Sequence, residues 1–203
     1  MRAWLIAITL LGALAFAGPA LALDPPKSDD DISAPATHKP TGLSFPPSIA
    51  NVALLRSTDY GRSINSPGLG FGYTYGVPGR LLITAYVYDL DQRVPDGYQS
   101  PAVDAAFDES LQSIHVVAQR AGKYRDLRLV QPPTTCAYGV VVFRCATLAA
   151  VSSDGTQPLY AKLLLTGYRQ YFLKLRTDWR QNSPDDTAEV ERVLQTFVGA
   201  ILR

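Results

Sequence analysis

Hydrophobic residues stand at every second position in the most regular stretch of this chain. Such a period-two pattern predicts a β-strand with one hydrophobic face. The alternating residues are Leu69, Phe71, Tyr73 and Tyr75. Val77-Pro78-Gly79-Arg80 follows, with proline and glycine where a type II turn requires them. A second strand over residues 81–89 completes a hairpin, in which we pair Val77 with Arg80.

This register gathers aromatic side chains on one face of the hairpin, and we take them as a candidate ligand-binding face. The residues are Phe71, Tyr73, Tyr75, Tyr86 and Tyr88. Tyrosine combines a large apolar area with a polar tip, so an exposed cluster suits a glycan or a protein partner. The alternative is that a helix or loop covers the face as part of the core. The opposite face carries glycines.

Two stretches have the three- and four-residue spacing of an amphipathic helix. The first covers residues 101–121, with Ser100 as N-cap and Pro101 at the first helical position. We expect its small side chains to pack on the glycine face of the hairpin. The second has Ser183 as N-cap and Pro184 at its first position and stays apolar up to Leu202, so we expect it to pack into the body of the protein.

Further strands are predicted at residues 52–60, 124–130, 139–151, 159–166 and 171–179. The last two need a loop of odd length, such as residues 167–169, if their apolar residues are to share one face. That loop also gathers basic side chains on the outer face of the sheet. The resulting basic patch is Lys162, Lys174, Arg176 and Arg180. It is either an ordinary solvated face or a surface that meets anionic envelope polymers.

The order of these elements is βββ-α-ββββ-α, which predicts an α+β fold. We expect a largely antiparallel sheet of about six or seven strands with two packed helices. A single domain over residues 43–203 accounts for all of them.

The first 22 residues have the three parts of a cleavable secretory signal peptide. Arg2 is the basic start, residues 3–17 are apolar, and Ala20-Leu21-Ala22 is a cleavage pattern. We therefore expect export to the periplasm or the exterior, with cleavage near Ala22 and no membrane span in the mature chain. Residues 23–42, rich in proline and aspartate, predict a flexible leader in which His38 is solvated.

Charge and cysteine content narrow the classes of function. Loss of Arg2 leaves 18 basic and 18 acidic residues, so the basic excess of a nucleic-acid-binding protein is absent. Cys136 and Cys145 are the only cysteines, and in an oxidising compartment they are expected to form a structural disulfide.

Enzyme and metal motifs are missing from the sequence. Neither the G-x-S-x-G nor the H-E-x-x-H pattern occurs. The acidic stretch from Asp89 to Asp96 departs from a calcium loop, because Arg93 would occupy a ligand position. We therefore predict no catalytic residue, no metal and no cofactor. A pair of carboxylates that meets only in the folded chain stays open as an alternative.

The stretch from Pro67-Gly68-Leu69-Gly70 to Tyr86-Val87-Tyr88-Asp89-Leu90, with the later Leu173-Lys174-Leu175-Arg176, resembles uncharacterised exported proteins of Gram-negative bacteria. The element order is similar to that of the Mog1/PsbP-like α+β fold. These resemblances imply a fold and bring no catalytic residues.

The sequence thus favours an exported, soluble, non-catalytic accessory or binding protein of the bacterial envelope. Its expected partner is an envelope protein or glycan, and not a nucleic acid. The alternative is a periplasmic hydrolase that acts on envelope polymers through two carboxylates.

Overall fold

The computed structural model describes residue 34 and residues 36–121 and 124–202. The predicted signal peptide (1–22) and most of the predicted leader lie outside the described residues. The elements are β1 (Thr37–His38), β2 (Leu43–Ser44), β3 (Ser48–Ile49), β4 (Val52–Asp59), α1 (Tyr60–Ser63), a 3₁₀ turn (Pro67–Leu69), β5 (Phe71–Val77), β6 (Leu81–Tyr88), α2 (Pro101–Ala121), β7 (Tyr124–Leu129), β8 (Thr134–Tyr138), β9 (Val141–Ser152), β10 (Pro158–Tyr168), β11 (Tyr171–Arg180) and α3 (Asp186–Ile201).

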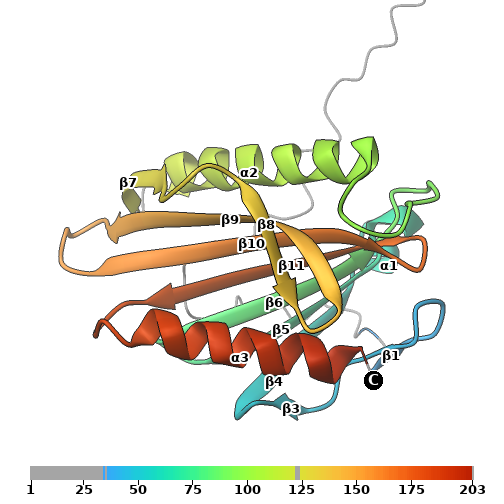
Figure 1. Cartoon of the computed structure of the whole chain (residues 1–203), viewed down its shortest axis with the longest axis horizontal. Coiled ribbons are helices and arrows are strands. Elements are labelled where there is room, and N and C mark those ends of the chain that lie inside the picture. Colours follow the sequence, from blue (N-terminus) through green and yellow to red (C-terminus); the bar gives the residue numbers. More distant parts are fainter. Residues whose placement is uncertain (1–33, 35, 122–123, 203) are drawn as a thin grey trace, which may run out of the picture.

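One antiparallel sheet of nine strands forms the centre of the described structure (Figure 1). Its strand order is β3-β4-β5-β6-β11-β10-β9-β7, and β8 also pairs with β9. The predicted α+β class is confirmed, and so is the order of its main elements. The sequence missed β8 and the short strands β1 to β3. Of these, β3 and β8 raise the number in the large sheet above the expected six or seven, whereas β1 and β2 form a separate two-stranded sheet.

The two long helices pack on opposite faces of the sheet. Helix α3 covers one face, the α3 face, through Val190, Leu194 and Phe197, which pack on alternating residues of the central strands. Helix α2 packs on the other, the α2 face, through Val103 and Phe107. Figure 1 shows α3 in front of the sheet and α2 along its β7–β9 side. Burial of apolar side chains on both faces stabilises the fold.

The folded body begins before Leu43. Thr37 and His38 form β1, which pairs with β2, and the His38 ring lies edge-on to Phe71 and Tyr171. The expectation that His38 is solvated is wrong, because only 3% of the residue is exposed. Its Nδ1 lies 2.7 Å from the Thr41 hydroxyl oxygen, so a neighbouring side chain replaces water as hydrogen-bond partner.

The β5–β6 hairpin has the predicted turn but a different register. The Arg80 amide donates to the Val77 carbonyl oxygen at 3.0 Å, and Gly79 has φ of +73°. However, Val77 pairs with Leu81, so three residues form the loop. A type II turn does not match the twist of two strands, and an additional loop residue relieves the mismatch. This shift by one residue moves every side chain of β6 to the other face.

The β10–β11 hairpin also differs from the expectation. Tyr168 pairs with Tyr171, so the loop is the two residues Arg169 and Gln170, both with positive φ. The predicted odd loop is therefore wrong. The loop before α2 holds this turn, since the Gln170 amide donates to the Asp96 carboxylate at 3.0 Å. Even parity places Lys174 opposite Leu165 and Arg176 opposite Leu163.

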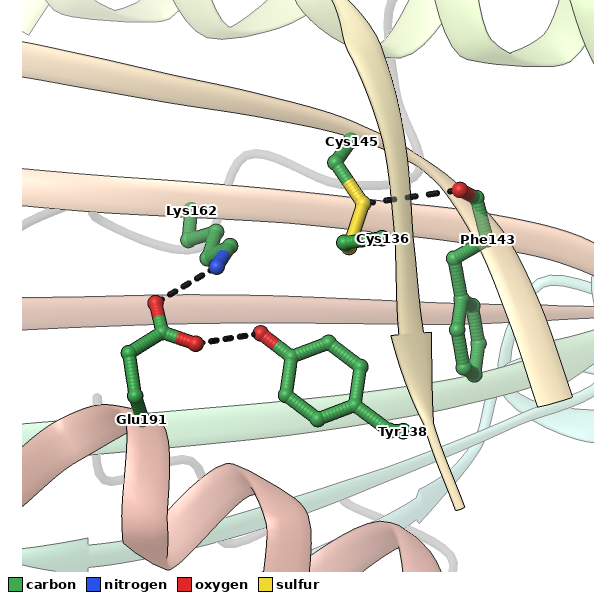
Figure 2. Close-up of a disulfide and its surroundings, with 6 residues drawn as sticks. All are labelled: Cys136, Tyr138, Phe143, Cys145, Lys162 and Glu191. Atoms are coloured by element: carbon green, nitrogen blue, oxygen red, sulfur yellow. Dashed lines mark hydrogen bonds and ion pairs between the residues drawn. A yellow bond between two sulfur atoms is a disulfide. The ribbon is translucent and has the colours of Figure 1, made fainter. Parts of the chain in front are cut away.

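The predicted disulfide joins Cys136 on β8 to Cys145 on β9, with the Cα atoms 6.0 Å apart (Figure 2). Phe143 and Cys145 are buried in the core of the α3 face, and Cys136 packs against it. The bond closes a loop of about ten residues and removes entropy from the unfolded chain, which stabilises the fold. It cross-links the two strands of the β8–β9 hairpin.

Candidate functional site

A groove opens between α2 and the central strands of the α2 face. We call it the α2 groove, and its cavity volume is about 110 Å³. Its lining residues are Leu69, Tyr86, Tyr88, Leu90, Ala106, Glu109, Ser110, Ser113, Ile114, Val117, Leu163, Lys174 and Arg176. This volume is below that of pockets for drug-sized ligands, so the groove suits a short chemical group.

Helix α2 forms one wall of this groove because of where it packs. Its apolar stripe contacts β10 and β7, and it does not lie on the glycines of β5 as the sequence suggested. The Tyr60 ring occupies that place, since a Cβ atom on Gly72 would stand 2.7 Å from it. The helix therefore leaves the space over β6 and β11 open. It presents the polar side chains of Glu109, Ser110 and Ser113 to the groove.

Lys174 forms part of the groove floor. It projects from β11 beside its neighbour Tyr86, and only 7% of the residue is exposed. Its Nζ lies 4.7 Å from the ring centroid of Tyr86 and 5.2 Å from that of Tyr88. Burial and, to a smaller extent, Arg176 lower the pKa of Lys174 to about 7, although Glu109 opposes both effects. At neutral pH the amine is therefore close to its titration point.

Arg176 and Asp178 follow Lys174 on the same face of β11. The Arg176 Nε lies 3.2 Å from an Asp178 carboxylate oxygen, and both side chains are largely buried. Burial raises the pKa of Asp178 to about 6, although Arg176 opposes the shift. Three ionisable residues in succession on a buried face cost stability, and such a departure from ordinary packing is typical of functional sites.

The two groove tyrosines are packed on their own neighbours. The Tyr88 ring lies 5.0 Å from the Phe172 ring, and the Tyr86 ring lies 6.3 Å from that of Tyr60, centroid to centroid. Burial raises the pKa of both tyrosines, so they stay protonated and can donate a hydrogen bond. Their rings form the aromatic surface that Lys174 Nζ contacts.

The predicted aromatic face does not exist as one surface. Tyr73 and Tyr75 are fully buried on the α3 face, where Tyr73 stacks on Phe45 and the Tyr75 hydroxyl donates to the Pro46 carbonyl oxygen. Phe71 lies on that same face, half-buried. Tyr86 and Tyr88 lie on the α2 face in the groove. The physical reason is the one-residue shift of the β5–β6 register.

The predicted basic patch is divided as well. Lys174 and Arg176 line the α2 groove, while Lys162 lies on the α3 face. Arg180 lines another cavity, of about 280 Å³, at the start of α3. Because the two-residue turn changes the parity of β11, Lys162 and Lys174 end on opposite faces of the sheet.

Lys162 belongs to a closed network under α3 (Figure 2). Its Nζ is paired with one carboxylate oxygen of Glu191, and the Tyr138 hydroxyl donates to the other at 2.6 Å. Burial and the Glu191 contact raise the pKa of Tyr138. Tyr138 stands two residues after Cys136, so the disulfide hairpin positions this network. Both carboxylate oxygens of Glu191 have partners within the protein, so this network is explained as a structural contact.

The carboxylates in the cavity that Arg180 lines already have structural partners. Asp186 accepts hydrogen bonds from the backbone amides of Asn182 and Ser183, and Glu189 is paired with Arg80. Such roles do not favour a hydrolytic pair. The described residues also contain no cluster of three or more metal-binding side chains. Among the described helices, none combines the length and the apolar character needed to cross a membrane.

Comparison with known proteins leaves the family open. No protein-family model matches the sequence, and no curated protein matches it. The Ran-binding protein Mog1p of Saccharomyces cerevisiae is similar in structure, with a TM-score of 0.40 and 10% identity over 64% of this chain and 79% of Mog1p. LpqN of Mycobacterium tuberculosis, involved in cell envelope biogenesis, has a TM-score of 0.30 and 13% identity over 85% of this chain and 78% of LpqN. Both TM-scores are below 0.5, and no inference about this chain rests on either likeness.

Proposed function

We propose that this chain is an exported, non-catalytic binding protein of the bacterial envelope whose α2 groove receives a carboxylate on a short apolar stem. One observation carries the proposal. Lys174 and Arg176 are placed by the β10–β11 turn in a groove whose walls include Leu163, Ile114 and Val117. The basic groups at the floor complement a carboxylate, and the apolar groups on the walls complement the apolar stem that carries it.

Export is supported by the amino-terminal sequence and by the disulfide. The apolar stretch before Ala22 has the form of a signal peptide. The bond between Cys136 and Cys145 fits an oxidising compartment. Mass spectrometry of the chain purified from the periplasm of a bacterial host is expected to give Leu23 as the first residue. A chain that keeps residue 1 would contradict cleavage.

The ligand class follows from the size of the groove and from the basic side chains of Lys174 and Arg176, which line it together with Glu109. A cavity of about 110 Å³ admits a carboxylate and a few methylene groups. The carboxylate is placed near Lys174 and Arg176, and hydroxyls of Ser110 and Ser113 on α2 add polar contacts. We infer that a larger envelope protein or glycan inserts an acidic group here, while most of its surface stays outside.

A series of carboxylates tests the proposal. Acetate, butyrate and hexanoate are titrated into the exported protein, and amide chemical shifts along α2 and β11 are followed by NMR. Affinity is expected to rise about fourfold per methylene until the groove is full, since each buried CH₂ contributes about 0.8 kcal/mol. It is also expected to rise as the pH falls from 8 to 6, because a protonated Lys174 favours the anion.

Two arginine variants provide the matched comparison. Arg176→Leu removes a basic group of the groove and is expected to weaken butyrate binding at least tenfold. Arg125→Leu changes an exposed arginine on the edge strand β7 and is expected to leave it unchanged. Equal binding by both variants, or no shifts along α2 and β11 with any carboxylate, would rule out the groove as the site.

A further inference from the structure

The α2 groove holds a primary amine in surroundings that suit covalent chemistry. Lys174 Nζ lies against the Tyr86 and Tyr88 rings, and its residue lines a cavity with apolar walls. Amines act as nucleophiles in their neutral form, and a lysine removed from water favours that form. Other lysines of the described chain lack this setting: Lys39 is exposed, and Lys162 lies on the opposite face of the sheet, away from the groove.

We propose that Lys174 captures small aldehydes in the α2 groove as a reversible imine. This inference rests on the proposed function only in that both place a short-stemmed ligand in the same groove. The apolar walls that would hold the stem of a carboxylate hold that of an aldehyde equally well. The carbonyl carbon then lies next to Nζ, where proximity favours addition.

The reaction balances without an oxidant or a reductant. The Lys174 nitrogen attacks the carbonyl carbon and forms a C–N bond, and the carbonyl oxygen takes up a proton to become a hydroxyl. The second hydrogen of the amine and this hydroxyl then leave as water, and the C=N bond forms. Addition of water reverses each step, so the capture releases the aldehyde unchanged.

The charged and titratable groups around Lys174 set the pH range of this chemistry. Arg176 on β11 repels a proton from the amine, whereas Glu109 on α2 favours one. Tyr86 and Tyr88 on β6 keep their protons, because burial raises the pKa of both. The opposing residues on β10, Leu163 and Leu165, are apolar. The amine therefore changes charge near pH 7, where the pKa of Lys174 lies.

Butyraldehyde with cyanoborohydride is the direct test. Cyanoborohydride reduces the imine to a stable secondary amine, which peptide mass spectrometry assigns to a residue. On the intact exported protein at pH 7, Lys174 is expected to be labelled at least tenfold faster than Lys39. An ordinary exposed lysine is less than about 0.1% neutral at that pH.

The pH profile adds a signature that a structural lysine does not give. From pH 7 to pH 9 the labelling of Lys174 is expected to rise no more than about tenfold, because the pKa of its amine is lowered to about 7. Labelling of a solvent-exposed lysine with an ordinary pKa is expected to rise roughly a hundredfold over the same range. Labelling of Lys174 no faster than that of Lys39 at pH 7 would overturn the proposal.

Variants and a competitor separate the two proposals about the groove. Lys174→Arg keeps the charge but not the nucleophile and is expected to abolish the fast label, while Lys162→Arg is expected to keep it. Butyrate is expected to slow the labelling of Lys174. Fast labelling without any effect of butyrate would contradict the carboxylate site and leave the imine standing. Butyrate binding without fast labelling would contradict the imine alone.

Discussion

Two lysines of one hairpin, Lys162 on β10 and Lys174 on β11, lie on opposite faces of the sheet in different settings. Lys162 meets Glu191 and Tyr138 in a network that the disulfide hairpin and α3 enclose. Lys174 lies against two tyrosine rings and lines a groove. Both side chains are largely buried, so burial alone does not mark a functional lysine. The difference is that Lys174 lines the α2 groove and Lys162 does not.

The largest contrast between the two faces is in packing. Phe197 on α3 is fully buried, and its ring lies 5.0 Å from that of Tyr75, edge-on. Phe197→Ala is expected to lower the free energy of unfolding by about 3–5 kcal/mol through the cavity that it leaves. Val117→Ala, on the groove wall of α2, is expected to lower it by less than about 1.5 kcal/mol. Urea denaturation measures both, and equal losses would contradict the contrast.

Removal of the disulfide tests how much the cross-linked β8–β9 hairpin contributes to the stability of the α3 face. The double variant Cys136→Ala, Cys145→Ala is expected to lose about 2.5–3 kcal/mol, from the entropy of a loop of about ten residues. Thermal unfolding with and without a thiol reductant checks the result. The reductant is expected to lower the melting temperature of the wild type and to leave the variant unchanged. A variant as stable as the wild type would show that the bond adds nothing.

Lys174→Met is expected to raise the stability, by about 1–3 kcal/mol near pH 6. Burial lowers the pKa of Lys174 to about 7, against 10.5 for the unfolded chain. Between these values the unfolded state binds more protons, so the wild type gains stability as the pH rises. The gain from Lys174→Met should therefore fade toward pH 10. Lys39→Met on the surface serves as control, and a pH-independent gain would contradict the titration.

Substitutions of two glutamates of α3, Glu191 and Glu189, are expected to change the free energy of unfolding least, and they form a matched pair. Glu191→Gln removes the charge that pairs with Lys162; the Lys162 side chain is 12% exposed and that of Glu191 is 39% exposed, so the expected cost is about 1 kcal/mol. Glu189→Gln removes the partner of Arg80, and both of those side chains are more than 40% exposed. That change is expected to cost less than about 1 kcal/mol. Urea denaturation of the two variants side by side decides, and the reverse order would contradict the closed network.

Local signals in the sequence were sufficient for α2 and the disulfide, whereas α3 begins at Asp186 with Asp185 as N-cap, and not at Pro184 as expected. The Ser100 hydroxyl accepts a hydrogen bond from the Val103 amide at 3.2 Å, as the predicted N-cap requires. Cys136 and Cys145 pair because their spacing permits a hairpin and the chain has no further cysteine. Such features depend on neighbours close in sequence, and these are visible without the fold.

Strand register was not predictable in the same way. The odd β10–β11 loop was chosen because a two-residue loop would place a lysine beside leucines, and the fold places Lys174 opposite Leu165. The turn carries arginine and glutamine instead of the glycine or asparagine that usually indicates it. Its hydrogen bond from Gln170 to Asp96 comes from a distant loop. The rule that the buried face of a strand is apolar fails here, because the α2 groove has basic side chains on a buried face of the sheet.

The pairing of β6 with β11 has a consequence for the order in which the protein is made. Each residue of β6 finds its partner on β11 between 84 and 98 positions later in the chain. At roughly 5–20 residues per second of synthesis, the free edge of β6 waits on the order of 5–20 s for β11. An unpaired strand edge is a template for aggregation during such an interval. The nascent chain is therefore expected to need a chaperone until β11 emerges.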